Sequence, residues 1–173
     1  MINMTDGPVK LRKFTAADKT RLVELANNEK ISINLRDSFP HPYTESRAKE
    51  YLEFSIGQNP TLTFAIEYNG LYVGNIGFKM GHDVYRKSAE IICFLGEEYW
   101  NQGIMTRAVN LICEYGFKEL DLVRIYAQVF EYNTASMKVL EKTGFKKEAI
   151  FRKAVMKNGK IYDEYVYAKI IEE

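Results

Sequence analysis

The sequence predicts a single mixed α/β domain over residues 1–173, with a central twisted mixed β-sheet of about seven strands flanked by about four helices. Strand-like and helix-like segments follow one another in the order β-α-α-β-β-β-α-β-α-β-β. Two Asn-Gly dipeptides, at 69–70 and 158–159, mark tight antiparallel hairpins. One strand–helix–strand unit indicates a right-handed crossover between parallel neighbours. The sheet should therefore contain both kinds of pairing.

The composition argues against several classes of protein. The chain has 24 basic and 23 acidic residues, so its overall charge favours neither nucleic acid nor an anionic membrane as a partner. Cys93 and Cys113 lack metal-ligand spacing to each other or to His41 and His82, and we expect two reduced, buried thiols and no metal. The first residues do not resemble a secretion signal, and no apolar run approaches a membrane span. We expect a cytoplasmic protein.

The first half of the chain contains three strands and two helices. Residues 9–14 alternate between apolar and polar and predict a strand, after which Thr15 and Asp18 suggest the capping box of a helix. Two prolines keep residues 31–43 irregular before a second helix at 44–57, which Thr44 caps. The loop carries Arg36, Asp37, His41 and Tyr43; it either contributes to specificity or is simply packed down by its aromatic residues. Residues 61–68 and 71–79 form the first hairpin.

The second half begins with an apolar strand at 88–95 and a glycine-bearing turn. Beyond Gly103 a helix places its apolar residues on one face and its charged residues on the other. A strand at 124–130 and a helix at 133–143 follow, and Gly144 ends that helix. Residues 145–156 and 161–170 form the closing hairpin.

The strand, turn and helix start at 91–109 together have the features of an anion site. The first amides of a helix have no partner within it, and the helix dipole places partial positive charge there. Gly103 would let a phosphate approach the backbone without meeting a Cβ atom. Many similar turns bind nothing, so this signal needs support from elsewhere in the chain.

The element order and this turn resemble the GNAT superfamily of N-acetyltransferases. In that family the turn reads Gln/Arg-x-x-Gly-x-Gly/Ala and binds the pyrophosphate of acetyl-CoA through backbone amides; the matching residues here are 100–105, with Gly103 in the central place. Trp100 departs from this pattern, and an aromatic residue at its position resembles the turn of the branch that acetylates ribosomal-protein N-termini. Met105 replaces a small residue, but it keeps its N–H group. The resemblance implies that acetyl-CoA is bound by Phe94, Leu95, Asn101, Gln102, Gly103, Ile104, Met105, Thr106, Asn133 and Ser136.

A second motif, Asn133-Thr-Ala-Ser136, supports the same resemblance. Leu140 stands where the wider superfamily often has a tyrosine that protonates the leaving thiolate. In the ribosomal-protein branch and in similar polyamine and antibiotic acetyltransferases, the serine of an Asn-x-x-Ser motif is proposed as this acid. The resemblance therefore assigns the acid role to Ser136 and a pantetheine contact to Asn133. The alternative is that Asn133 is only a helix N-cap.

Acetyl transfer also needs a polarised thioester carbonyl and an amine that loses its proton. If the strands at 88–95 and 124–130 splay apart, the N–H group of Phe94 or Leu95 could polarise the carbonyl. Glu90 is the first candidate for the base, directly or through water; the alternative is that it pairs with a neighbouring Lys or Arg or sits at an exposed edge. His82, Tyr85 and Glu131 are weaker candidates, and an amine already deprotonated in solution needs no base.

The resemblance implies an acetyl-CoA-dependent N-acetyltransferase that acts by direct attack of a primary amine. A protein or peptide N-terminus is the first candidate acceptor, and a small amine such as a polyamine or an aminoglycoside is the second. The remaining alternative is a non-catalytic acyl-CoA-binding module. The protein is expected to be a monomer or a homodimer. We expect an acidic acceptor wall for a polycation and a neutral groove for a peptide N-terminus.

Overall fold

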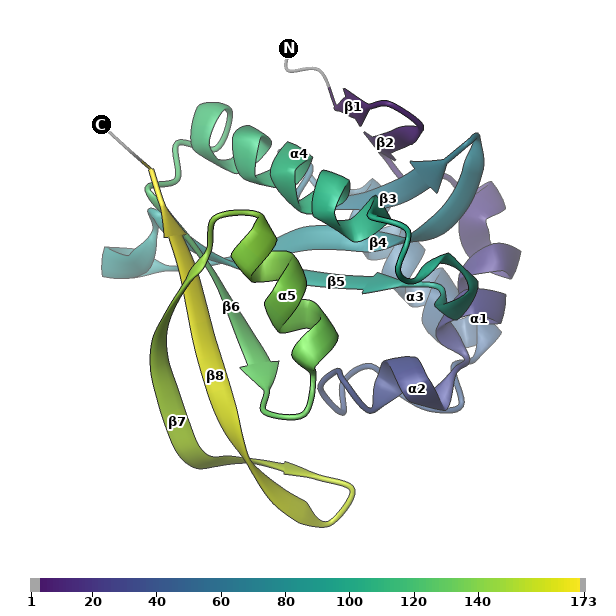
Figure 1. The fold of residues 1–173 in the computed structure, drawn as a ribbon. Coiled ribbons are helices and arrows are strands. Elements are labelled where there is room, and N and C mark those ends of the chain that lie inside the picture. The colour runs from purple at the N-terminus through teal and green to yellow at the C-terminus, as the bar shows by residue number, and fades with distance from the viewer. Residues whose placement is uncertain (1–3, 172–173) are drawn as a thin grey trace.

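The computed structural model describes residues 4–171, and within them eight strands form one mixed sheet (Figure 1). The strand order is β1-β2-β3-β4-β5-β6-β8-β7, and only β5 and β6 pair in parallel. The strands are β1 Thr5–Asp6, β2 Val9–Arg12, β3 Thr63–Tyr68, β4 Leu71–Met80, β5 Ser88–Leu95, β6 Arg124–Phe130, β7 Lys146–Lys157 and β8 Lys160–Ile170. The predicted fold class is confirmed. The additional strand is β1, which is only two residues long and carries no periodicity that a sequence pattern could reveal.

The four predicted helices are present, and a short fifth one appears where the sequence predicted irregular chain. The helices are α1 Lys19–Ala26, α2 Glu29–Ser32, α3 Glu45–Ile56, α4 Ile104–Lys118 and α5 Thr134–Lys142. The prediction that residues 31–43 are irregular throughout is wrong at its start, because Asn28 caps α2 by accepting a hydrogen bond from the Lys30 N–H group at 2.9 Å. The strand predicted for residues 9–14 ends at Arg12.

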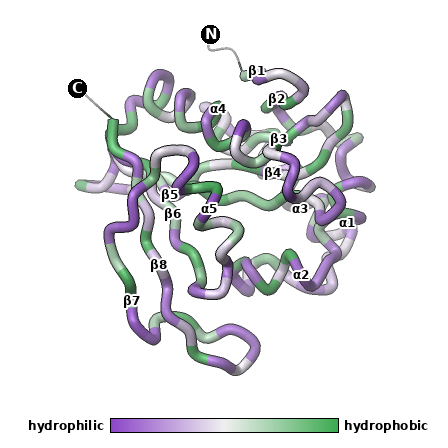
Figure 2. The backbone as a smooth tube through the Cα atoms, in the orientation of Figure 1, coloured by the Kyte–Doolittle hydropathy of each residue, from purple (hydrophilic) through white to green (hydrophobic). Residues whose placement is uncertain are grey.

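Helices cover both faces of the sheet (Figure 1). One buried cluster lies under α4 and α5, and the other under α1 and α3. The side chains of β5 alternate between them, since Ala89, Ile91 and Leu95 join the first cluster and Phe94 joins the second. Along α4 hydrophobic and hydrophilic segments alternate within the helical turns (Figure 2), as expected for a helix with one face on a sheet.

Both Asn-Gly hairpins are confirmed by their backbone angles. Asn69 and Gly70 have φ values of 49° and 79°, and Asn158 and Gly159 have φ values of 50° and 74°. These positive angles are those that a two-residue hairpin turn of the favoured twist requires. The second hairpin places the end of β7 beside the loop that precedes α3, where Lys157 donates a hydrogen bond to Asp37.

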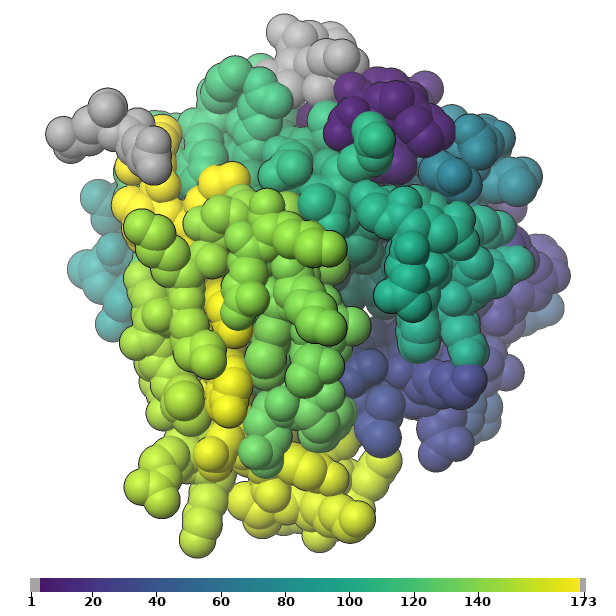
Figure 3. All heavy atoms as spheres, viewed as in Figure 1, coloured from purple at the N-terminus to yellow at the C-terminus, as the bar shows by residue number. Residues whose placement is uncertain are grey.

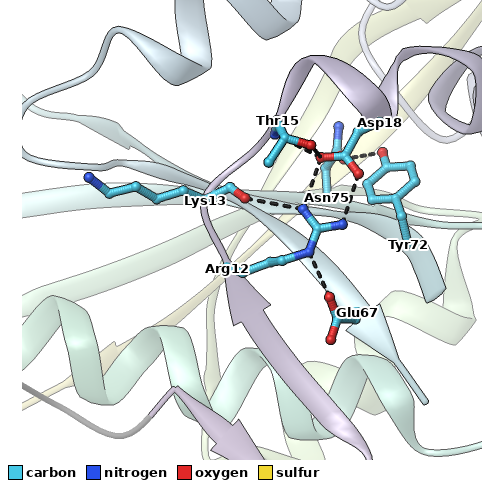
Figure 4. Close-up of polar contacts among 7 residues, drawn as sticks. All are labelled: Arg12, Lys13, Thr15, Asp18, Glu67, Tyr72 and Asn75. Atoms are coloured by element: carbon cyan, nitrogen blue, oxygen red, sulfur yellow. Dashed lines mark hydrogen bonds and ion pairs between the residues drawn. The ribbon is translucent and has the colours of Figure 1, made fainter. Parts of the chain in front are cut away.

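A partly buried polar network, with Asp18 as its buried member, connects β2 to the start of α1 (Figure 4). Arg12 donates two hydrogen bonds to the Asp18 carboxylate, at 2.9 and 2.8 Å, and a third to Glu67 at 2.7 Å. The Thr15 N–H group also donates to Asp18, at 2.9 Å, as the predicted capping box requires. Burial opposes the charged form of Asp18, but the hydrogen bonds from Arg12 and Thr15 outweigh it and lower the pKa of Asp18.

Both cysteines are free; Cys113 is buried as predicted, whereas Cys93 is only half-buried, and burial raises the pKa of Cys93 to about 11 and that of Cys113 to about 12. Since the thiolate is the reactive form, these thiols are poor nucleophiles at neutral pH. Within residues 4–171 no helix is long and apolar enough to cross a membrane.

Candidate active site

The site is organised around the point at which β5 and β6 separate. Their parallel register joins Ser88 to Arg124, Ala89 to Ile125 and Glu90 to Tyr126, and it extends no further although both strands continue. The second half of β5 therefore has β4 on one side only. Backbone groups of β5 that would pair with β6 are left facing the opening between the strands.

The direction of the β5 N–H groups shows whether Phe94 or Leu95, the two residues predicted to donate to the thioester carbonyl, faces the opening. The Gly96 N–H group donates to Val73 O at 2.9 Å, on the β4 side. In an antiparallel ladder alternate residues turn their N–H groups to the same neighbour, so Phe94 also bonds toward β4. The N–H group of Leu95 consequently faces the opening, and Leu95 is better placed than Phe94 to donate to a bound carbonyl.

A tight turn connects β5 to α4. Asn101 and Gly103 both have positive φ values, 59° and 73°, and a Cβ atom added to Gly103 would have no heavy atom within 4 Å. Gly103 is therefore required by the backbone angle, and the space beside it is open. The Trp100 indole secures the turn by donating from Nε1 to the Leu95 carbonyl oxygen at 2.8 Å. Sequence reasoning related Trp100 to the ribosomal-protein branch but did not predict this hydrogen bond.

The turn presents the free amides of the α4 N-terminus. Gly103 is the N-cap and has no side chain to bond them, so the first-turn N–H groups of Ile104, Met105 and Thr106 lack an intrahelical or capping partner. The Met105 side chain is half-buried and packs against the buried cluster below α4, as the sequence predicted. Asn101 and Gln102 are exposed at the edge of the turn.

Asn133 and Ser136 lie at the start of α5. The Asn133 side chain caps α5 by accepting a hydrogen bond from the Ser136 N–H group at 3.3 Å, so its predicted alternative role is present. The Asn133 amide nitrogen and the Ser136 hydroxyl have no hydrogen-bond partner among the residues that the structure describes. Figure 3 shows a groove between α5 and the turn that leads into α4. The two predicted motifs thus lie on opposite sides of one groove.

Glu90 is buried on the face of β5 that points away from α4, and its side chain is only 7% exposed. Arg36, from the loop before α3, donates to Glu90 Oε1 at 2.6 Å and to Gln128 Oε1 at 3.1 Å. This ion pair is the alternative that the sequence left open for Glu90. The second carboxylate oxygen, Oε2, accepts no hydrogen bond from the described part of the chain.

A pocket of about 310 Å³ lies next to this ion pair, between the loop before α3 and the second hairpin. Its polar lining consists of Arg36, Asp37, Gln128, Lys157 and Glu164, and Phe130 contributes to its apolar wall. Acceptor contacts are expected from three segments, the loop at 31–43, the closing hairpin around 156–162 and the loop at 82–87, and the first two of them meet here. The third segment does not, since His82 and Tyr85 are exposed and absent from the lining.

Three of these residues were not singled out by sequence reasoning, although Lys157 lies in the closing hairpin that was expected to contact an acceptor. Gln128, Lys157 and Glu164 lie on different strands and belong to no motif. The available signal was the strand alternation, which places Gln128 on the face of β6 opposite the buried Ala127 and Val129. Only the register shows which residues of β8 lie across from β6, and it pairs Phe130 with Glu164.

A GNAT acetyltransferase domain model matches residues 9–146, which is most of the chain. The chain belongs to the GNAT acetyltransferase family. It is 32% identical to the uncharacterized N-acetyltransferase YoaA of Bacillus subtilis, over 90% of this chain and 82% of YoaA. It is also 28% identical to the spermidine N(1)-acetyltransferase of Escherichia coli, over 87% of this chain and 80% of that protein. This GNAT chain is accordingly an N-acetyltransferase.

Solved structures of GNAT proteins have the same fold. A GNAT-family acetyltransferase from Bacillus anthracis superposes with a TM-score of 0.86 at 25% identity, covering 98% of both chains. The ribosomal L7/L12 N-terminal acetyltransferase RimL, in complex with coenzyme A, has a TM-score of 0.86 at 21% identity over 96% of both chains. The microcin C7 self-immunity acetyltransferase MccE, in complex with acetyl-CoA and AMP, has a TM-score of 0.82 at 27% identity over 96% of this chain and 94% of MccE.

Proposed function

We propose that this GNAT protein transfers the acetyl group of acetyl-CoA to a primary amine by direct attack, with a protein or peptide N-terminus as its acceptor. The observation that carries the proposal is the separation of β5 from β6 beside the Gly103 turn. In this proposal a thioester on the α4–α5 side and an amine on the Glu90 side would meet at the opening between β5 and β6. The coenzyme A and acetyl-CoA complexes of RimL and MccE support this choice of donor.

The residues present fit acetyl-CoA, which supplies the acetyl group as a thioester. The uncapped N–H groups of Ile104, Met105 and Thr106 would bind the pyrophosphate, because Gly103 leaves the approach open. Asn101 and Gln102 would contact it from the edge of the turn. The free amide nitrogen of Asn133 would donate to the pantetheine arm while its oxygen caps α5.

The chain's own groups supply the remaining chemistry. The Leu95 N–H group would donate to the thioester carbonyl oxygen and stabilise negative charge there. The Ser136 hydroxyl, which has no competing partner in the described chain, would donate its proton to the departing sulfur. Glu90 Oε2 would accept the proton of the attacking amine, directly or through water, while Arg36 holds Oε1.

A small-amine acceptor is the second candidate, and the relationship to the Escherichia coli spermidine acetyltransferase favours it. The test is the release of CoA thiol from acetyl-CoA with each member of an amine panel: lysine-free peptides with a free N-terminal Ala or Ser, spermidine, and an aminoglycoside. Mass spectrometry of the products identifies the acetylated group. The proposal predicts N-terminally acetylated peptide.

Ser136→Ala should reduce turnover without loss of acetyl-CoA binding in a calorimetric titration. Thr134→Ala is the matched control, since it removes an exposed hydroxyl from the same helical turn. Tight acetyl-CoA binding without transfer to any amine would instead indicate a non-catalytic acyl-CoA-binding module. Equal turnover by Ser136→Ala and the wild type would exclude Ser136 as the acid.

A further inference from the structure

The pocket beside Glu90 contains an almost balanced set of charges. Three carboxylates, those of Glu90, Asp37 and Glu164, lie at or next to it, together with two cations, Arg36 and Lys157. Lys157 is buried, with its side chain only 8% exposed, and it donates to Asp37 at 2.8 Å. Arg36 donates to Glu90 at 2.6 Å. Each cation is thus matched to one carboxylate.

Glu164 is the carboxylate left over from this pairing. Gln128 donates from Nε2 to Glu164 Oε2 at 3.2 Å, and no cation lies within ion-pair distance of Glu164 among residues 4–171. The other oxygen, Oε1, accepts no hydrogen bond in that part of the chain. Burial and the negative charge of Glu90 raise the pKa of Glu164, although Arg36 acts in the opposite direction. A half-buried carboxylate without a counter-ion is the group that a bound ammonium would stabilise most.

The Gln128 side chain holds Glu164 in place. Its oxygen accepts from Arg36 at 3.1 Å while its nitrogen donates to Glu164. A continuous chain of hydrogen bonds therefore runs from Glu90 through Arg36 and Gln128 to Glu164. Because Arg36 has only hydrogen-bond donors, it fixes which end of the Gln128 amide faces Glu164.

We propose that Glu164 binds the ammonium group of the acceptor and that the pocket admits an amine carrying one positive charge, a peptide α-amino group rather than a polyamine. This inference rests on the proposed function and specifies its acceptor site. A singly charged amine finds one unmatched carboxylate and, beside it, the apolar wall that includes Phe130 and Val155. A polyamine would bring several charges to a pocket whose other two carboxylates are already paired with Arg36 and Lys157.

The test compares the KM values of a lysine-free peptide with a free N-terminus and of spermidine across four proteins. Glu164→Gln should raise the peptide KM by roughly tenfold or more, the usual effect of losing a charge-assisted hydrogen bond, with the KM for acetyl-CoA unchanged. Glu164→Asp, which keeps the charge, should recover part of the loss. The matched control is Glu148→Gln, which removes a carboxylate paired with Arg124 outside the pocket and should leave the peptide KM within about twofold of the wild type.

A fifth protein, Arg36→Gln, tests the charge balance of the pocket without any substitution at Glu164, so an effect of that substitution on folding cannot enter. It leaves Glu90 without its cation, so the pocket gains a net negative charge. The ratio of kcat/KM for spermidine to that for the peptide should rise. The inference is overturned if Glu164→Gln leaves the peptide KM unchanged, if Arg36→Gln leaves the ratio unchanged, or if the wild type prefers spermidine. Failure of the wild type to acetylate any amine would overturn the proposed function itself, and the inference with it.

Discussion

Replacing Gly103 by Asp should weaken acetyl-CoA binding through charge, and replacing it by Asn separates that effect from backbone strain. Gly103 has a φ of 73° and open space where a Cβ atom would lie, so the two variants share the same strain and neither meets a steric clash. Asn and Asp both tolerate this backbone region better than most residues, at a cost of about 1 kcal/mol. Unfolding free energies of the two variants should therefore be similar.

The charge term can be worked out from the position of Gly103. A carboxylate at the N-cap lies next to the three free amides, where a pyrophosphate with two negative charges would bind. At a separation of about 5 Å in a medium as polar as water, each pair of charges repels by about 0.8 kcal/mol, or about 1.7 kcal/mol in total. The acetyl-CoA dissociation constant of Gly103→Asp should exceed that of Gly103→Asn by roughly 17-fold.

Isothermal titration calorimetry with acetyl-CoA measures both constants, and added salt supplies a second check. Because the repulsion is between solvent-exposed charges, the difference between the two variants should shrink as the ionic strength rises. Equal affinities for Asp, Asn and Gly at this position would refute the assignment of the turn as the pyrophosphate site.

Three further predictions concern catalysis, the turn and stability. Ser136→Ala should lower kcat by roughly 100-fold, as expected for loss of a general acid, with the acetyl-CoA dissociation constant within about twofold of the wild type; a rate unchanged in steady-state thiol release would contradict it. Trp100→Phe removes the 2.8 Å hydrogen bond to Leu95 O and should destabilise the fold by about 1 kcal/mol in urea unfolding while raising the KM for acetyl-CoA; an unaltered KM would show that the indole does not order the turn. Asp18→Asn should destabilise by about 3 kcal/mol at pH 7, because Arg12 loses its ion pair with the buried Asp18 and keeps only the one with Glu67. The pKa of Asp18 is lowered in the folded state, so its contribution is complete above the unfolded-state pKa of about 3.9 and is lost as the pH falls through the folded-state pKa. The difference in unfolding free energy between wild type and variant should therefore be constant from about pH 6 to 8 and diminish below about pH 4; a difference independent of pH down to acid unfolding would show that the carboxylate charge is not its source.

Local signals were sufficient for most of the fold. The Asn-Gly turns, the apolar run at 88–95 and the helical period after Gly103 each depend on interactions between residues close in sequence, and the structure has all of them. The short strand β1 and the helix α2 were missed because elements of two and four residues show no period. Packing and a single N-cap, rather than a pattern, decide such elements.

The sequence by itself therefore determined the fold, the family resemblance and the positions of the two motifs around Gly103 and Ser136 that we propose to bind the donor, since each motif is a contiguous stretch whose backbone geometry is local. It left open whether Glu90 pairs with a cation and which N–H group of β5 faces the opening. Those points depend on strand register and on Arg36, 54 residues away along the chain. The pocket proposed for the acceptor depends on contacts at still longer range, such as that of Lys157 with Asp37, 120 residues apart. Only the tertiary structure could decide them, because no local interaction relates those charges to one another.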